Sequence, residues 1–197
     1  MKYRKLGNTG LIVSEVALGS MQFGGKMKMG NLGQEDTSKM VKLALERGIN
    51  FIDTADVYSQ GESETLLGNA LKGVREEIVL ATKVRLPMSD NFNRSGATRV
   101  NILRGVESSL KRLQTDWIDL YQVHGWDSHT PFEETLRTLD DLVRQGKVRY
   151  IGMSNLLSWQ GATALAIQER LGLEKYATAQ MYYSLVGRGL EHEFQSF

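Results

Sequence analysis

The chain has 197 residues, of which 41% are hydrophobic and 24% charged, a composition typical of one folded domain with a substantial core. Its formal net charge of +1 gives no electrostatic reason to expect binding to nucleic acid or to an anionic membrane surface. The sequence contains no cysteine, which excludes disulfides and thiolate metal sites, and no run approaches the ~20 apolar residues that cross a bilayer. We therefore expect a cytoplasmic protein that binds neither nucleic acid nor membrane.

The first 13 residues predict a β-hairpin whose turn is Asn8-Thr9-Gly10. Such a hairpin could plug the amino-terminal floor of a barrel. Residues 16–18 are the expected first barrel strand. The following segment, 22–33, is rich in glycine and includes Met27 and Met29, and we expect a mobile lip there.

Five further predicted strands each end on a polar residue, and a helix-like segment separates each strand from the next. This alternation is typical of repeated βα units on a parallel sheet. Polar groups at the carboxyl ends of successive parallel strands indicate an active-site mouth, because the opposite rim serves mainly stability. The five residues are Asp53, Lys83, His124, Ser154 and Gln180.

The expected helices cover about 35–47, 62–71, 98–112 and 158–171, with a fourth helix between the last two. That fourth helix has the clearest start signal. We expect Thr130 to cap it, Pro131 to occupy its first position and Glu133 to complete a capping box.

The predicted fold is an α/β barrel of the (β/α)₈ type with about six βα units and an N-terminal β-hairpin, forming one domain over residues 1–197. A closed barrel of this type usually takes ~250 residues, so two units are expected to be missing at the C-terminal end. An unclosed barrel exposes sheet edges and apolar core, and self-association through that edge is expected.

Four polar residues together predict a proton-donating site. A tyrosine hydroxyl such as that of Tyr58 is a poor acid, and a neighbouring lysine ammonium would lower its pKa. Lys83 could supply the cation, Asp53 could hold it, and His124 could hydrogen-bond a substrate oxygen, as general acid catalysis at a carbonyl requires. Taken singly, each residue has an ordinary structural interpretation; their order on consecutive strands favours the catalytic one.

A metal site is the competing interpretation of one segment. His124, Asp127 and His129 form an H-x-x-D-x-H string that could in principle bind a cation. Because His124 ends a strand and His129 precedes a helix, their convergence is not favoured, and we expect no metal.

Other side chains favour a binding role. The hydroxyl of Ser154 and the amides of Asn155 and Gln180 suit the orientation of a planar carboxamide, although Asn155 could instead cap the next loop. No G-x-G-x-x-G, P-loop or G-x-S-x-G motif occurs, so neither a Rossmann dinucleotide site nor a serine nucleophile is predicted.

The order and spacing of these motifs resemble the aldo-keto reductase family over essentially the whole chain. The matching segments are Arg4-Lys5-Leu6-Gly7, Val13-Ser14, Leu18-Gly19, 48–55 with Tyr58 and Gly61, Ala81-Thr82-Lys83, 119–124, 146–155, and Gln180 with Tyr183-Ser184-Leu185.

The resemblance implies a (β/α)₈ barrel that binds NADPH across its carboxyl-terminal mouth and reduces aldehydes or ketones. By that analogy Tyr58 donates the proton while the nicotinamide delivers hydride to the carbonyl carbon. Lys83, held by Asp53, would tune Tyr58, and His124 would orient the carbonyl oxygen.

The same resemblance assigns the binding residues. Ser154, Asn155 and Gln180, together with Asp53, would lie at the nicotinamide. The remaining expected contacts are Gly19, Ser20 and Met21 beside the cofactor and substrate, and Trp126 as a wall of the substrate pocket or as core packing.

One departure concerns the cofactor clamp. Family members have seventh and eighth strands whose loops supply an aromatic residue and basic groups for NADPH, and these are not found in the 197 residues. The expectation is an NADPH-dependent reductase whose present chain binds NADPH weakly or not at all. The alternatives are an inactive truncated fragment and a redox-sensing binding subunit of the same family.

Overall fold

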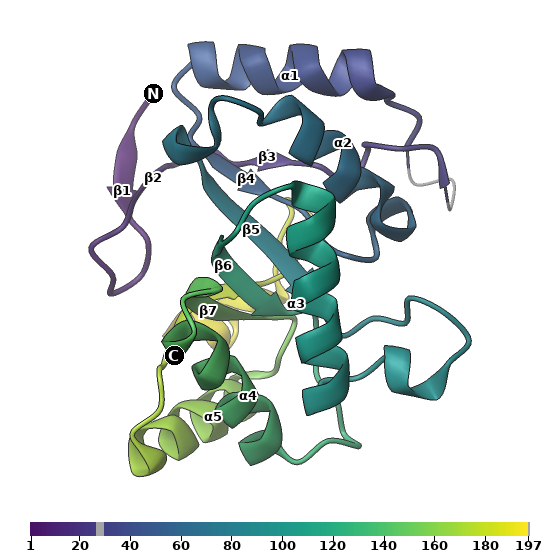
Figure 1. Cartoon of the computed structure of the whole chain (residues 1–197). Coiled ribbons are helices and arrows are strands. Elements are labelled where there is room, and N and C mark those ends of the chain that lie inside the picture. Colours follow the sequence, from purple (N-terminus) through teal and green to yellow (C-terminus); the bar gives the residue numbers. More distant parts are fainter. Residues whose placement is uncertain (27–29, 197) are drawn as a thin grey trace.

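A computed structural model describes residues 1–26 and 30–196 of the chain (Figure 1). Met27 and Met29 of the predicted lip lie outside the described residues. Both flanks of that segment are anchored, because Phe23 is fully buried and forms an isolated bridge with Leu32.

A six-stranded parallel sheet forms the centre of the molecule, with its strands in chain order. The sheet curls into part of a (β/α)₈ barrel, as the sequence predicts. The first strand is shorter and later than expected, since Val16 is exposed and pairing starts at Leu18. The strands are β3 (Leu18–Gly19), β4 (Phe51–Asp53), β5 (Val79–Val84), β6 (Ile118–Val123), β7 (Val148–Ser154) and β8 (Tyr176–Gln180).

Helices lie on the convex side of this sheet, between successive strands in the chain (Figure 1). The βα alternation predicted from the sequence is therefore confirmed. The helices are α1 (Gln34–Glu46), α2 (Glu62–Ala70), α3 (Arg99–Leu113), α4 (Phe132–Arg144) and α5 (Ser158–Leu171). Short 3₁₀ turns occur at η2 (Tyr58–Gly61), η3 (Arg75–Glu77), η4 (Phe92–Arg94), η5 (Gly189–Glu191) and η6 (Phe194–Ser196).

The predicted capping box of the fourth helix is wrong. Pro131, in an extended conformation, occupies the N-cap position of α4, and no side chain caps the helix. The hydroxyl of Thr130 donates instead to Asp127 at 2.6 Å, and Glu133 forms an ion pair with Arg170 of α5. A neighbouring residue of the same loop therefore takes the Thr130 hydroxyl, and a residue of another helix takes Glu133.

The core has two layers, one on each side of the sheet. The outer layer packs strands against helices, with residues such as Ile52 and Leu67 near α2 and Ile102 and Ile151 near α3 and α4. Leu139 is one of its fully buried members.

The inner layer fills the concave side of the sheet, and the N-terminal hairpin β1 (Tyr3–Lys5) and β2 (Ile12–Ser14) closes it from below. Leu6 and Val13 belong to one buried cluster with Val79, Ala81 and Leu120 of β5 and β6. The hairpin also approaches β8, because a Cβ on Gly7 would lie 2.1 Å from the carbonyl oxygen of Ala177. The hairpin thus plugs the floor, as the sequence suggests.

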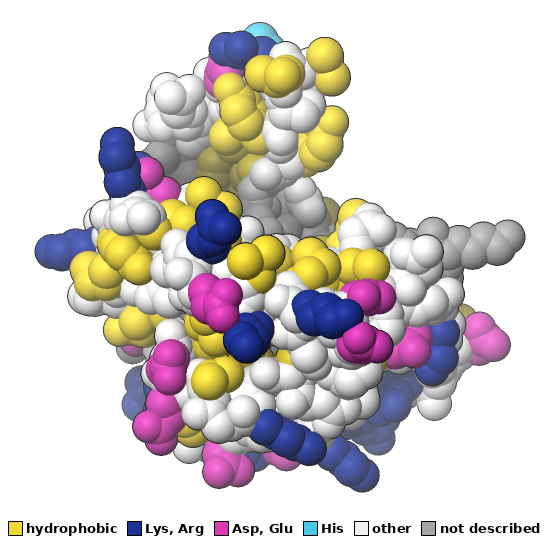
Figure 2. Space-filling model, turned by 90° about the horizontal axis from the view of Figure 1, so that it is seen from above, with side chains coloured by type: hydrophobic (Ala, Val, Ile, Leu, Met, Phe, Trp, Pro, Cys, Tyr) yellow, Lys and Arg dark blue, Asp and Glu magenta, His cyan; other side chains and the backbone are white. Residues whose placement is uncertain are grey.

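The face of the molecule that carries α1 is mixed in character (Figure 2). Figure 2, a view from above with α1 toward the viewer, shows hydrophobic side chains between Lys, Arg, Asp and Glu side chains. On α1 the exposed hydrophobic residues include Met40 and Leu43. Within the described residues, no helix is long and apolar enough to span a membrane.

Candidate active site

The polar residues expected at the strand ends lie there in the structure. Asp53, Ser154 and Gln180 are the last residues of β4, β7 and β8, Lys83 is the penultimate residue of β5, and His124 follows β6 directly. The carboxyl ends of parallel strands meet at one rim of a barrel. The five side chains therefore belong to a single mouth, opposite the hairpin plug.

Lys83 and Asp53 form the most constrained pair at this mouth. The lysine side chain is buried, and its Nζ donates to both carboxylate oxygens of Asp53 at 2.8 and 2.7 Å and to the carbonyl oxygen of Thr54 at 2.8 Å. Burial lowers the pKa of Lys83, while the charge and hydrogen bonds of Asp53 act to raise it. The three acceptors satisfy all three ammonium protons and fix the cation beside the mouth.

Tyr58 is the first residue of η2 and lies close to this pair. The next two residues of the turn, Ser59 and Gln60, have left-handed backbone conformations, with φ values of 48° and 54°. The Nζ of Lys83 lies 5.2 Å from the centroid of the Tyr58 ring. Among the described residues the phenol oxygen has no hydrogen-bond partner.

The proton affinity of Tyr58 differs from the sequence expectation. Burial and the negative charge of Asp53 raise the pKa of Tyr58 to about 12, whereas a lysine at its hydroxyl would lower it. The reason is geometric: Asp53 compensates the charge of Lys83, and the ammonium faces the ring without a hydrogen bond to the phenol oxygen.

His124 lies beside Tyr58, with ring centroids 5.9 Å apart and planes at 77°. Burial, followed by the positive charges of Lys83 and Arg85, lowers the pKa of His124 to about 4. At neutral pH the imidazole is therefore uncharged. Its Nδ1 is buried and has no hydrogen-bond partner among the described residues.

A chain of amide contacts crosses the mouth and links distant strands. The amide nitrogen of Gln180 on β8 donates to Asp53 on β4 at 3.2 Å. The side-chain oxygen of Gln180 accepts from Gln122 on β6 at 3.1 Å. The curl of the sheet makes this possible, because β4 and β8 are separated by three strands in the sheet order.

The other predicted cofactor contacts divide into exposed and buried groups. Asn155 is exposed with φ of 53°, and its amide nitrogen donates to the hydroxyl of the buried Ser154 at 3.0 Å. Gly19 and Met21 are exposed at the end of β3. Ser20 is fully buried and accepts from Ser63 at 2.9 Å, so its hydroxyl lies toward α2.

Trp126 and Asp127 have packing partners that the sequence does not reveal. The Trp126 ring lies 4.4 Å from that of Phe132 and 6.0 Å from that of Trp159, which favours packing; its role as a pocket wall stays a prediction. Asp127 accepts hydrogen bonds from the backbone amides of Ala97 and His129 and from the hydroxyl of Thr130. Asp127 therefore organises the loop before α4, and no group of three metal-ligating side chains occurs among the described residues.

Comparison with known proteins identifies the family. The sequence profile of the Aldo/keto reductase family matches residues 15–195. The chain belongs to this family.

Its relatives include proteins named as reductases. The chain is 38% identical to versiconal hemiacetal acetate reductase of Aspergillus parasiticus, over 98% of this chain and 62% of that protein. It is 39% identical to aldo-keto reductase YhdN of Bacillus subtilis (strain 168), over 97% of this chain and 56% of that protein. The uncharacterized oxidoreductase YrpG of the same strain is 40% identical, over 98% of this chain and 61% of that protein. The chain thus spans about 60% of the length of these relatives.

The sequence analysis did not predict several residues that lie around the mouth. Gln122 could have been found, because it lies two residues before His124 and so shares the inward face of β6. Behind the mouth, Glu64 of α2 accepts from Thr82 at 2.6 Å and from Arg112 at 2.7 Å. This second cluster has no local signal, since Glu64 and Arg112 are 48 positions apart.

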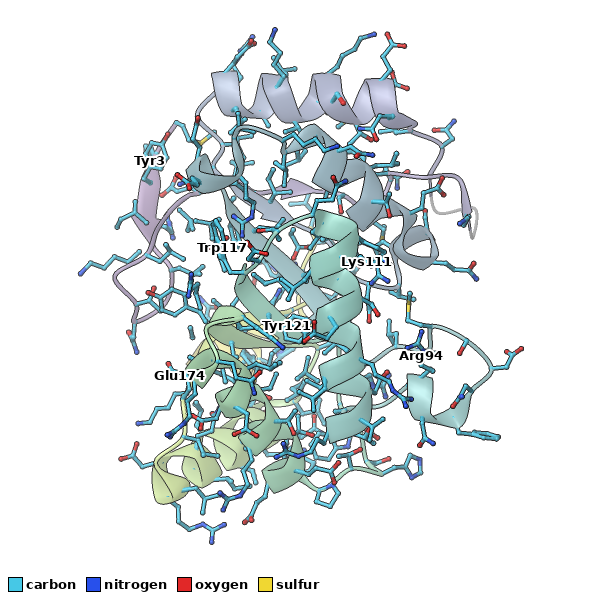
Figure 3. All side chains as sticks on the ribbon, in the orientation of Figure 1. Tyr3, Arg94, Lys111, Trp117, Tyr121 and Glu174 are labelled. Atoms are coloured by element: carbon cyan, nitrogen blue, oxygen red, sulfur yellow. The ribbon has the colours of Figure 1, made fainter. Side chains whose placement is uncertain are left out.

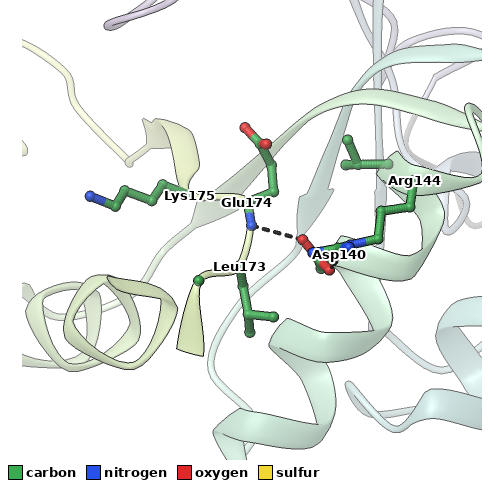
Figure 4. A pocket seen from close by; sticks show the side chains of 7 residues that line it. Asp140, Arg144, Leu173, Glu174 and Lys175 are labelled. Atoms are coloured by element: carbon green, nitrogen blue, oxygen red, sulfur yellow. Dashed lines mark hydrogen bonds and ion pairs between the residues drawn. The ribbon is translucent and has the colours of Figure 1, made fainter. Parts of the chain in front are cut away.

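A large hollow elsewhere has a structural explanation. A cavity of about 470 Å³ lies between α4 and the loop that leads into β8 (Figure 4). There Asp140 accepts from the backbone amide of Glu174 at 2.8 Å and pairs with Arg144. Because this loop precedes β8, the cavity belongs to the amino-terminal rim, which serves mainly stability in such barrels.

Proposed function

We propose that the protein acts as an NADPH-dependent oxidoreductase that reduces the carbonyl group of an aldehyde or ketone, with Tyr58 as proton donor. One observation carries the proposal: Tyr58, the Lys83–Asp53 pair and His124 lie together at the carboxyl ends of β4, β5 and β6. Family membership and relatives named as reductases support this type of reaction. The preference for NADPH rests on the family resemblance.

Each side chain has a defined task in the reaction. Tyr58 is protonated at neutral pH, as an ordinary phenol with a pKa of ~10 would be, and it can release the proton to an oxygen that gains negative charge. The ammonium of Lys83, 5.2 Å from the Tyr58 ring centroid, is the positive charge beside the phenolate that remains, and Asp53 compensates part of that charge. Neutral His124 carries one ring N–H, which can donate a hydrogen bond to the carbonyl oxygen and orient it.

The residues at the rim fit the nicotinamide end of the cofactor. Asn155 uses only its amide nitrogen in the contact with Ser154, which leaves its carbonyl oxygen available to a carboxamide N–H. Gln180 is exposed beside it, and the backbone amide of Asn155 donates to the carbonyl oxygen of Gln180 at 3.1 Å. NADPH would supply the hydride at this rim, and Gly19 and Met21 would border it.

The decisive experiment compares the chain with its Tyr58→Phe variant in NADPH oxidation with 4-nitrobenzaldehyde. Loss of a general acid costs typically 10²–10⁴-fold, so we expect at least a ~100-fold lower kcat in the variant. Tyr3→Phe is the matched control, because Tyr3 is on the hairpin at the opposite rim and its hydroxyl donates to the carbonyl oxygen of Gly48. Turnover that survives in Tyr58→Phe would reject Tyr58 as the donor.

Cofactor binding is measured separately from turnover by fluorescence titration with NADPH. A folded chain that binds NADPH but fails to reduce the aldehyde would contradict the proposed reaction. An Asn155→Ala variant is expected to bind NADPH several-fold more weakly, since it removes the amide assigned to the nicotinamide. Equal affinity in chain and variant would remove Asn155 from the site.

A further inference from the structure

Asp56 is a buried carboxyl group close to the proposed site with no assigned role. It lies three residues beyond β4, only 2% exposed, and its backbone amide donates to the carbonyl oxygen of Lys83 at 3.2 Å. Its Oδ1 has no hydrogen-bond partner among the described residues. A buried, unsatisfied carboxylate oxygen is costly, so such a group calls for an explanation.

The side chain of Asp56 lies behind the sheet, on the side of the helices. Thr82 and Tyr121 face this side, since Thr82 contacts Glu64 of α2 and Tyr121 approaches Gly105 of α3. In a strand, alternate residues face opposite sides. Lys83 therefore faces the mouth while its neighbour Thr82 faces the layer that contains Asp56.

Charged groups surround Asp56 on every element packed against it. Asp56 interacts through charge with Glu64 of α2, with Arg112 of α3 and with Lys83 of β5, although the Lys83 side chain points to the mouth. Its charge also acts on Tyr121 of β6. Arg94, from η4, and Arg104, from α3, line the same space (Figure 3 labels Arg94 and Tyr121).

A small cavity lies in this layer, between Asp56, α3 and the loop before α3. Its volume is about 20 Å³, enough for one water molecule, and it is lined by Asp56, Gly105 and Arg112 among others. The exposed residue Arg104 lies at its rim. Tyr121, whose hydroxyl is likewise buried without a partner, lies next to Gly105. A water molecule in this cavity would lie next to the Asp56 carboxyl.

The pKa of Lys83 responds to the charges of three carboxyl groups, which are those of Asp53, Asp56 and Glu64. Asp53 forms a bidentate pair with the ammonium at the mouth. Asp56 forms no contact with the ammonium but acts on it through charge from behind the sheet, and this acts to raise the pKa of Lys83 against the lowering effect of burial.

We propose that Asp56 is a positioning residue, a reserve counter-ion that becomes charged in alkaline solution and then holds Lys83 in its ammonium form. This inference rests on the proposed function for the importance of Lys83, but its chemistry concerns the two side chains alone. Burial, and then the charge of Glu64, raise the pKa of Asp56 to about 8. Asp56 is therefore neutral at lower pH, where Lys83 keeps its proton with Asp53 as its paired carboxylate. It ionises as the pH approaches the range in which a buried lysine would lose that proton.

The test is an NMR titration of the Lys83 ¹³Cε resonance in the full chain and in Asp56→Asn. The variant preserves shape and removes the ionisable group. We expect Lys83 to lose its proton about 0.5–1 pH unit lower in Asp56→Asn, the size of one partly screened charge inside a protein. Tyr121→Phe is the matched control, because it removes a hydroxyl near the same cavity without changing charge, and its Lys83 titration should be unchanged.

A second measurement on the unaltered chain keeps the proposal testable if Asp56→Asn does not fold. The ¹³Cγ resonance of Asp56 should titrate between about pH 7 and 9, and the Lys83 resonance should shift over the same interval. An unchanged Lys83 titration in folded Asp56→Asn, or an Asp56 carboxyl already ionised at pH 6, would overturn the proposal. Neither readout needs NADPH or turnover, so the failure of the proposed reaction is distinguishable from the failure of this inference.

Discussion

The polar residues at the mouth differ mainly in how far, and in which direction, their surroundings shift their pKa values. Burial and nearby cations lower the pKa of His124 to about 4, while burial and Asp53 raise that of Tyr58 to about 12. Between about pH 5 and 11 the imidazole is therefore neutral and the phenol protonated. This combination suits a site that hydrogen-bonds a neutral carbonyl and releases a proton only when charge develops on the oxygen.

The lowered pKa of His124 predicts a specific pH dependence of stability. The unfolded chain binds a proton at His124 below pH 6.5 and the folded chain only below about pH 4, so stability is lost as the pH falls through this window. Between pH 7 and 4.5 the free energy of unfolding of the His124→Gln variant should fall by roughly 2 kcal/mol less than that of the parent chain. This figure is discounted because His124 is partly exposed. Urea denaturation at several pH values measures this difference. If the free energy of unfolding depended on pH in the same way in both proteins, His124 would have an ordinary proton affinity in the folded chain.

Residue identity and spacing locate the site but do not fix its electrostatics. Asp53, Lys83 and His124 were predictable because each directly follows or ends a run of strand-forming residues. The pKa of Tyr58 was not, because it depends on which atom of the phenol Lys83 approaches. The raised pKa of Asp56, two residues before Tyr58, was equally unpredictable, because its charged neighbours Glu64 and Arg112 come from later helices.

At the scale of elements, strands were easier to predict than caps. β7 and β8 end at Ser154 and Gln180, as the hydrophobic runs indicate. The predicted cap of α4 failed because the Thr130 hydroxyl donates to Asp127, three residues earlier in the same loop, and Glu133 pairs with Arg170 of α5. Strand ends are set by backbone pairing, whereas a capping side chain can be taken by another side chain, near or distant in the sequence.

The hairpin β1–β2 yields a stability prediction. Leu6 is buried against Val79 and Leu120, so Leu6→Ala would leave a cavity in the barrel floor and cost about 2–3 kcal/mol of unfolding free energy. Ile12 is the matched control on the same hairpin, because it is 47% exposed, and Ile12→Ala should cost far less. Chemical denaturation of both variants measures the contrast. Equal losses would mean that the hairpin does not plug the floor.

At the scale of the molecule, the sheet exposes two edges in the described structure, β3 and β8. β8 contains no charged residue between Tyr176 and Gln180, so it lacks the charges that usually prevent edge-to-edge pairing. The segment after it exposes Tyr182, Leu185 and Val186, the last two at 93% and 95%. An unpaired edge beside exposed apolar side chains favours association.

We therefore expect the isolated chain to self-associate through β8 and residues 182–186. In sedimentation velocity its average mass should rise with concentration, and Leu185→Glu combined with Val186→Lys should reduce that rise, because charged side chains oppose edge pairing and apolar contact. Leu43→Glu is the matched control, since Leu43 is an exposed hydrophobic residue on α1, which connects β3 to β4 at the other end of the sheet from β8. A concentration-independent monomer would show that the edge is protected in solution. Equal effects of the control and the double variant would place the contact elsewhere on the surface.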